Sequence, residues 1–467
     1  MRDIIVTLII VGLMPTCFRR PFVGLIVFSW LAYMRVQDLT WGFARDVRWS
    51  FYVGAITFAG YLSGPRRKLF LNDLRSWVMI LLVAIIGIGI VFSVNPDDDQ
   101  FKRYMELIKI IGVALFTTAV VRNREHLRVL VWVIALSLGF YGVKSGIWFI
   151  ATGARGQILQ GPGGMLADNN DLSMALAMAV PMLLHIGLSE KREILRRAFL
   201  LCVPLTIITI GATYSRGGFL SVMAAMAVLV WRSRNRFAGF SIGALVLLAG
   251  FIGMPQDYKD RLATLGNPYE EGSAAGRLRA WKIATAMAID NPLLGVGFGK
   301  YRQHYLDYCP DPTPKELSGR ALIVAHNSYL QIWAECGTPA FALFLTLIGM
   351  SIWTCWKMRR LARQRYFASW IINYATMFEA SIAAFVVGAT FLNRSHFDLF
   401  YHWVAIILVF GVIAQRELED TAAYPIRPGA RGTLARVRPM GFCGALPQLA
   451  QSRGFRNAPL RPQPREG

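Results

Sequence analysis

The chain has 467 residues, of which 55% are hydrophobic, and its formal net charge is +22. In a soluble protein such a charge would suggest nucleic-acid binding. Here the Lys and Arg residues cluster in short loops between long apolar blocks and in the C-terminal tail, which is the pattern of a membrane protein. We therefore expect no nucleic-acid partner and predict an integral protein surrounded by membrane lipids.

The apolar blocks predict an all-α polytopic membrane protein. Uncharged runs such as residues 77–92 must close their own backbone hydrogen bonds in hydrocarbon, as a helix does. Several segments are shorter than the roughly 20 residues of a full span, so we predict 12–14 transmembrane helices. The segments lie at 4–18, 22–34, 51–63, 77–94, 107–121, 129–151, 172–188, 198–214, 219–231, 238–254, 328–356, 367–393 and 400–415.

Five basic stretches set the predicted orientation. Each neighbouring pair encloses an even number of apolar segments, so all five lie on the cytoplasmic side together. The stretches between them then lie on the outer, periplasmic face, and the C-terminus lies in the cytoplasm. The basic stretches are 64–68, 122–128, 189–197, 232–236 and 357–365, and the outer ones are 95–104, 153–171, 215–218, 255–325 and 394–399.

The pattern divides the chain into four predicted parts. Long loops between spans are usually functional or disordered, and the one long outer loop contains a predicted amphipathic helix around 276–290 that Asn291-Pro292 ends. The Arg-, Pro- and Gly-rich tail is predicted to be disordered. The parts are an N-terminal transmembrane bundle (1–254), the periplasmic loop (255–325), C-terminal transmembrane helices (326–415) and a basic cytoplasmic tail (416–467).

Two arginines stand where an anion would be bound. Arg216, in the sequence YSRGG, lies at the outer end of a span, where a guanidinium can hold a phosphate bidentately and flanking glycines let backbone come close. Arg277 lies in the first turn of the predicted loop helix, near its free amides. The alternatives are an interfacial turn with a snorkelling arginine and a solvated surface helix. The following GVGFG run lacks the strand of a nucleotide-binding motif.

His326 lies where the long loop returns to the membrane. A neutral imidazole suits proton abstraction from a hydroxyl at this surface, although a lone interfacial histidine is more often structural. No metal-binding pattern surrounds it. Other polar residues also lie toward the outer face: Lys144, the 168–171 run DNND with Asn170, and Arg394. That run also fits a helix cap. Their clustering favours an outward-facing site.

Three motifs in order, YSRGG (214–218), GRLRAWKIA with NPLLGVGFGKY (276–301) and AHNSYLQIWAECGT (325–338), resemble the O-antigen ligase and polymerase superfamily. The stretches 20–44 and 161–184 further resemble the O-glycosylation ligases associated with exosortase systems. The resemblance covers residues 1–415. It implies a GT-C-like glycosyltransferase, without metal or other cofactor, in the bacterial inner membrane.

The resemblance also implies a reaction and its residues. A glycan passes from undecaprenyl pyrophosphate to an acceptor hydroxyl, on protein Ser/Thr or on lipid, at the periplasmic face. Arg216 and Arg277 match arginines that hold the donor, and His326 matches a histidine that activates or orients the acceptor. Lys144 and Arg394 come from membrane placement alone. The re-entry motif adds further matching positions with less defined roles: Asn327, Tyr329, Glu335 and Gly337.

Two alternatives remain open. A polymerase that joins lipid-linked repeat units shares these motifs, and it would lengthen lipid-linked chains without any acceptor. A transporter or lipid flippase would show discontinuous helices in related halves, and the sequence has no evident internal symmetry. That alternative also leaves the long loop and its histidine unexplained.

Overall fold

The computed structural model describes residues 2–65, 68–92, 97–154, 156–233, 236, 272–319 and 322–427, all within the first of two compact units, Met1–Pro428. The regular elements among these residues are helices, which confirms the predicted all-α class. They are α1 (Arg2–Arg19), α2 (Pro21–Tyr33), α3 (Trp49–Leu62), α4 (Leu74–Val91), α5 (Asp98–Val120), α6 (Arg124–Ala151), α7 (Asn169–Ser189), α8 (Glu193–Ala212), α9 (Arg216–Arg232), α12 (Gly272–Asp290), α13 (Pro314–Leu317), α14 (Ser328–Arg363), α15 (Ser369–Ala389) and α16 (Asp398–Glu419), joined by short 3₁₀ turns.

Seven of the described helices are long and apolar enough to cross a membrane: α4, α6, α7, α8, α14, α15 and α16. They make the chain a multi-pass membrane protein. The number is below the predicted 12–14 because α2, α3 and α9 have only 13, 14 and 17 residues, and because charged residues fill the first half of α5. The segment predicted at 238–254 lies outside the described residues, as do 255–271 of the long loop and the tail beyond 427.

Helices α7 and α16 form the centre of the bundle. In their most apolar stretches, 78% and 83% of the residues are buried inside the protein, against 22% in α8. Large apolar side chains are exposed instead on the outer helices, for example Trp77 on α4, Leu201 on α8 and Trp353 on α14. Exposed apolar surface of this extent is expected where lipid covers the protein.

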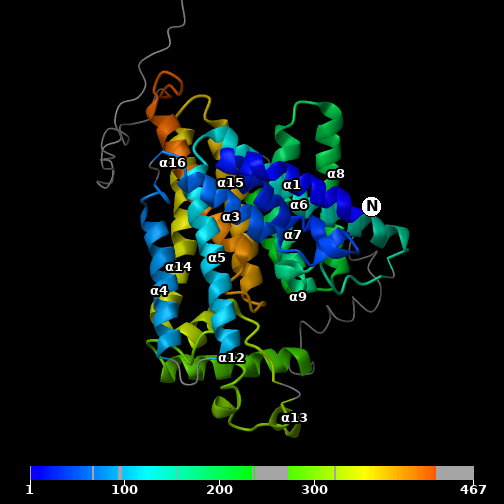
Figure 1. Cartoon of the computed structure of the whole chain (residues 1–467), viewed down its shortest axis with the longest axis vertical. Helices are drawn as coiled ribbons and strands as arrows, with labels where there is room; N and C mark the ends of the chain where they lie inside the picture. Colours follow the sequence, from blue (N-terminus) through cyan, green and yellow to red (C-terminus); the bar gives the residue numbers. More distant parts are fainter. Residues whose placement is uncertain are drawn as a thin grey trace, which may run out of the picture. The chain divides into compact units, whose positions relative to one another are not determined.

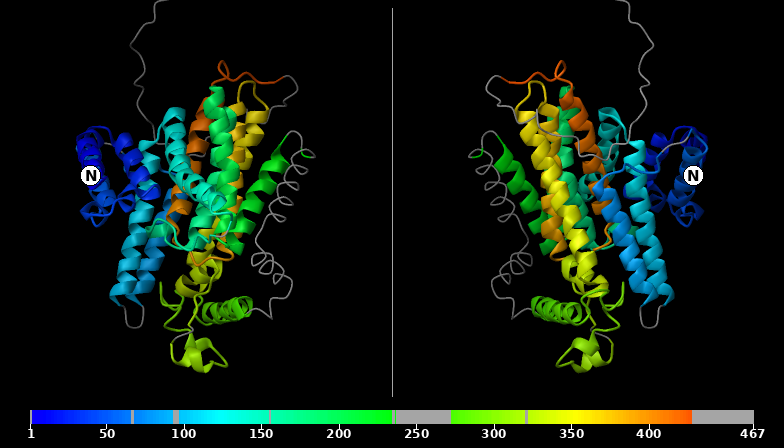
Figure 2. Two further views of the ribbon diagram at one scale, coloured as in Figure 1. Left: turned by 90° about the vertical axis from the view of Figure 1, so that its right-hand side faces the viewer. Right: turned by 90° about the vertical axis from the view of Figure 1, so that its left-hand side faces the viewer.

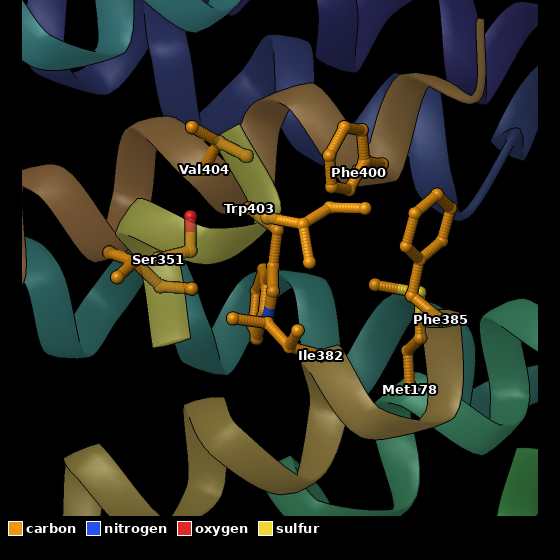
Figure 3. Close-up of a pocket in the computed structure, with 9 residues that line it drawn as sticks. Met178, Ser351, Ile382, Phe385, Phe400, Trp403 and Val404 are labelled. Carbon is orange, nitrogen blue, oxygen red and sulfur yellow. The ribbon is translucent and has the colours of Figure 1, made fainter. Parts of the chain in front are cut away.

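The centre is closely packed. Met178 of α7, Ser351 of α14, Ile382 of α15 and Trp403 of α16 line a cavity of only about 10 Å³ (Figure 3). A buried water needs about this much space and two to four polar partners. The Ser351 hydroxyl already donates to the carbonyl oxygen of Leu347 in its own helix, at 2.7 Å. This cavity is therefore a packing gap between helices and has no room for a substrate.

Several of the predicted outer stretches lie together at one end of the bundle. Lys300 of the long loop contacts Asp97 at 3.0 Å, and the Asn169 side chain donates to the Thr213 carbonyl oxygen at 2.9 Å. Helix α12 lies across this end and packs against α14 (Figures 1 and 2). At the other end, the Arg124 guanidinium lies 4.6 Å from the centre of the Trp370 ring. Which membrane face each end meets stays a prediction.

Helix α14 is broken near its start. Gly337 has φ +79° and ψ 176°, so a short first piece carrying the 328–336 sequence is set off from the long second piece. The segment after α12 packs into this break: the Val296 N–H donates to the Ala334 carbonyl oxygen at 2.9 Å, and the Thr338 N–H to that of Pro292 at 2.8 Å. Such close backbone approach explains why this segment is rich in glycine. A side chain on Gly295 would come 2.5 Å from the Ala334 oxygen.

The predicted tail begins later than residue 416. Helix α16 continues to Glu419, and the following turn returns to the start of α15. The Tyr366 N–H donates to the Pro425 carbonyl oxygen at 2.9 Å, and the Arg427 N–H to that of Gln364 at 3.0 Å. These hydrogen bonds hold residues up to 427 against the bundle, so the predicted boundary was about ten residues early.

Candidate active site

Three helices begin close together at the end of the bundle that α12 crosses. Asp168 caps α7, Ser215 caps α9 and Asn327 caps α14, each by accepting a backbone N–H from its first turn, at 2.8, 3.1 and 3.0 Å respectively. A helix N-terminus carries partial positive charge and amides without an intrahelical acceptor. Several such termini in one region favour a negatively charged ligand.

Side-chain hydrogen bonds join these three termini. The Ser215 hydroxyl donates to the Asn170 side-chain oxygen at 2.7 Å, which ties α9 to α7. Arg394, in the loop between α15 and α16, forms an ion pair with Asp171 of α7, and its backbone N–H donates to the Ser328 hydroxyl at 2.9 Å. Asn170 and Arg394 therefore lie within the region that the sequence predicted, and both have a structural part in it.

Arg216 is the first residue of α9 and is half-buried. Tyr214 just before it has φ +55°, a left-handed conformation that is uncommon outside glycine and turns the chain sharply. The two glycines after Arg216 serve helix packing. A side chain on Gly218 would come 2.1 Å from the Ser173 hydroxyl of α7, and one on Gly217 would come 3.0 Å from Phe391. The two glycines thus allow α9 to pack closely against α7 and Phe391.

His326 also has a left-handed backbone, with φ +46°. Such strain in a non-glycine residue is typical of functional positions. Burial, and after it the positive charge of Arg277, lowers the pKa of His326 below its ordinary value of 6.5; Arg302 acts in the same direction and Asp168 opposes it. Arg277 of α12 and His326 therefore lie within electrostatic reach of each other. At neutral pH the imidazole is uncharged and can accept a proton.

The other residues of the re-entry motif have structural functions. Asn327 is buried as the cap of α14. The Tyr329 hydroxyl donates to the Val386 carbonyl oxygen at 2.9 Å. Glu335 is only 3% exposed and accepts hydrogen bonds from the Tyr301 N–H at 3.4 Å and the Gln331 side chain at 3.2 Å. These three predicted ligand contacts are better explained as supports that hold the long loop and the His326 turn.

Lys144 differs from the rest of the predicted set. Its side chain is exposed on α6, whereas Gly142 and Gly146 on either side of it pack against α8. A residue between two packing positions of a helix points away from the neighbouring helix. The structure therefore does not bring Lys144 into the group of capped helix termini.

Sequence reasoning missed three charged or titratable residues here. Lys300 is 3% exposed and pairs with Asp97; hydrogen bonds from the Gln303 side chain, the Gln100 N–H and Lys300 hold the pKa of Asp97 well below its usual range. Arg302 acts on His326 from the same loop. Lys300 lies within the NPLLGVGFGKY motif and Arg302 directly follows it, but the motif does not show which residues they act on, because Asp97 and His326 lie elsewhere in the chain.

A second histidine lies at the same end. His396 stands between α15 and α16, and burial, followed by the charges of Arg394 and Arg103, lowers its pKa to about 4. Its Nδ1 atom is buried without a hydrogen-bond partner among the described residues. His396 is thus a neutral imidazole with a chemistry similar to that of His326, in different surroundings.

The arrangement suits anion binding beside a proton acceptor. The arginines, the three helix termini and a neutral imidazole gather at one end of a membrane bundle. In the described part of the chain, no group of three or more His, Cys, Asp or Glu side chains is placed to hold a metal ion. The arginines and the helix termini place positive charge at this end of the bundle.

Residues 198–345 match the O-Antigen ligase family, and residues 1–191 match a family of unknown function (DUF5935). No curated protein matches the chain. The first match includes Arg216, Arg277 and His326, and it supports the superfamily to which the sequence motifs point. Together with the seven apolar helices, it supports a membrane enzyme of the ligase or polymerase type that acts on a lipid-linked glycan.

Proposed function

We propose that this protein transfers a glycan from undecaprenyl pyrophosphate to an acceptor hydroxyl at the periplasmic face of a bacterial inner membrane. One observation carries the proposal: a neutral His326 within electrostatic reach of Arg277, Arg302 and Asp168, the residue that caps α7. A transferase of this kind needs an anion site for the donor next to a proton acceptor for the incoming hydroxyl.

The donor's pyrophosphate is assigned to Arg216 and Arg277. A guanidinium can donate two parallel hydrogen bonds to phosphate oxygens, and the amides of the α7, α9 and α14 termini add further donors. Negative charge grows on the leaving oxygen as its bond to the sugar breaks. Fixed cations aimed at that oxygen lower the barrier, and in this proposal they do so in place of a divalent metal. Arg394 is assigned to hold Asp171 and so to position α7.

His326 is assigned to the acceptor. Its neutral imidazole accepts the hydroxyl proton as the acceptor oxygen bonds to the anomeric carbon, and the pyrophosphate leaves with the electron pair of the broken bond. Attack from the face opposite the leaving group gives inversion. Analysis of the linkage in the product tests this step, since a retained anomeric configuration would exclude a single displacement.

The proposal favours a ligase over a polymerase. The resemblance of residues 20–44 and 161–184 to exosortase-associated ligases indicates a protein Ser or Thr as acceptor, with lipid as the alternative. Membranes that contain the lipid-linked donor but no acceptor separate the two activities. A ligase leaves the donor unchanged there, whereas a polymerase lengthens it.

A deletion strain complemented at matched membrane expression tests the assignment. Arg216→Ala, Arg277→Ala and His326→Ala should each abolish the glycosylated product while lipid-linked donor accumulates. Lys144→Ala is the matched control, because its side chain is a cation near the same end that lies outside the group. Normal transfer by all three site variants would refute the site and reopen the transporter alternative.

A further inference from the structure

A second cavity lies at the end of the bundle opposite the candidate active site. It has a volume of about 350 Å³ and lies between the start of α2, the end of α3 and the junction of α5 with α6. That volume is in the range of small-molecule sites, roughly 300–1,000 Å³. It is far larger than the packing gap at the centre of the bundle, and the proposed reaction involves none of the residues that line it.

The lining has two kinds of surface. Arg20, Arg122 and His126 supply basic groups, and no acidic residue is among the described residues that line the cavity. The remaining wall is apolar or aromatic: Pro21, Phe22, Val23, Tyr61 and Val120. A basic group beside an apolar wall fits a ligand with an anionic head and a hydrocarbon part.

His126 is held in place within this lining. Its ring stacks on Phe22 with 3.7 Å between ring centres and 7° between planes. Its Nδ1 atom is buried and has no hydrogen-bond partner among the described residues. Its backbone N–H donates at 2.8 Å to Asn123, the cap of α6, so the cavity also adjoins a helix N-terminus. A fixed ring, two guanidinium groups and a helix N-terminus together favour a phosphate.

The position of the cavity relative to the membrane indicates which kind of molecule carries the phosphate. Arg122 and His126 of the cavity lining belong to the basic stretch 122–128, which the sequence predicts at the cytoplasmic membrane surface. Anionic phospholipids of that leaflet attract such stretches. We propose that this cavity binds the phosphate headgroup of an anionic phospholipid, with the adjoining glycerol and acyl atoms against Phe22 and Val23.

Lipid retention by the purified full-length protein tests the proposal. Delipidated protein in detergent is titrated with phosphatidylglycerol, phosphatidylcholine, glycerol 3-phosphate or inorganic phosphate, and bound molecules are counted by native mass spectrometry. We expect one phosphatidylglycerol to bind at least tenfold more tightly than phosphatidylcholine, and the soluble phosphates to bind more weakly than either. Equal retention of the two lipids, or soluble phosphate binding as tightly as phosphatidylglycerol, would overturn the lipid assignment.

Three variants locate the site. Arg20→Gln with Arg122→Gln should weaken phosphatidylglycerol binding at least tenfold, and Val23→Phe should weaken it by filling the cavity without a change of charge. Arg128→Gln is the control, because this arginine lies on the same basic stretch with its guanidinium 5.4 Å from the centre of the Trp132 ring, outside the lining. Equal small losses of phosphatidylglycerol binding in the double variant and the control would refute a specific site. The binding would then be explained by the general positive charge of this surface.

Discussion

Arginines lie toward both ends of the bundle, but the two sets of arginines surround different groups. At the end opposite the candidate site, Arg232 of α9 and Arg359 of α14 both hold Glu379 of α15; Arg232 does so at 2.6 and 3.0 Å. At the site, Arg277 and Arg302 lie around His326, whose imidazole is neutral. A carboxylate neutralises the arginines that hold it, whereas a neutral imidazole adds no negative charge beside Arg277 and Arg302. The same residue type is structural in one place and suited to binding in the other.

The largest effect is expected at His326. His326→Ala should lower the transfer rate by about 10²–10⁴-fold, the range of general base catalysis. His396→Ala is the matched control and should retain most activity, because its imidazole lies outside the group formed with Arg277. Transfer rates of the purified variants with lipid-linked donor test both expectations. An equal loss of rate in the two variants would contradict a catalytic function specific to His326.

The pH dependence sharpens the same comparison. The active form of His326 is the neutral one, so activity should be full above its folded-state pKa and lost as pH falls through it. Because that pKa lies below the ordinary 6.5, the acid limb of the rate profile should lie below pH 6.5. It should be absent from the residual activity of His326→Ala. If the acid limb persists in His326→Ala, the titration of another group causes it.

Glu379 should matter for stability and not for chemistry. Glu379→Ala leaves the buried Arg359 and the partly exposed Arg232 without their carboxylate, and breaking a buried pair costs about 3–5 kcal/mol. Thermal unfolding in detergent should show this loss, while transfer per folded molecule stays near that of wild type. Glu193→Ala, in an exposed pair with Arg197, should leave unfolding unchanged. Wild-type stability in Glu379→Ala would contradict the structural function of this cluster.

Gly337 should have a smaller effect that reaches the site through the loop. A side chain there would meet the Leu293 carbonyl oxygen at 2.3 Å, and the φ of +79° is strained for any other residue. Gly337→Ala should destabilise by about 1–3 kcal/mol and lower transfer. Gly349→Ala, in the regular part of α14 with nothing within 4 Å, should be neutral or slightly stabilising. Equal behaviour of the two would contradict the packing of the long loop into the α14 break.

The smallest effect is expected at Lys144. Lys144→Ala should change transfer by less than twofold, because its side chain is exposed on α6 away from α8. Surface substitutions of this kind have small effects. A large loss of transfer with unchanged protein amount would place Lys144 in the site after all and would require a ligand that extends along α6.

Apolar patterning was enough to predict most of the fold. The long spans were found because a helix in lipid needs a continuous apolar run, and the loop helix was found because Asn291-Pro292 marks its end, which α12 meets at Asp290. The break at Gly337 was missed, since one glycine within an apolar run is compatible with an unbroken helix. The short helices were predicted as spans because their sequences are continuous apolar runs.

Part of the candidate site could be predicted from the sequence. Arg216, Arg277 and His326 could be named because each lies beside a turn or helix start. Lys300 and Arg302, within and directly after the NPLLGVGFGKY motif, were not named, because their relation to Asp97 and His326 depends on how the long loop folds back. Glu335 was named from its motif, and the structure shows its carboxylate accepting a hydrogen bond from the backbone of the long loop.

Donor binding and transfer, measured on the same purified preparations of His326→Gln and Arg277→Gln, test the central claim most directly. If arginines hold the pyrophosphate and His326 accepts the proton, His326→Gln binds the lipid-linked donor as tightly as wild type and does not transfer it. Arg277→Gln loses both binding and transfer. Wild-type transfer by His326→Gln, or undiminished donor binding by Arg277→Gln, would contradict this division of functions.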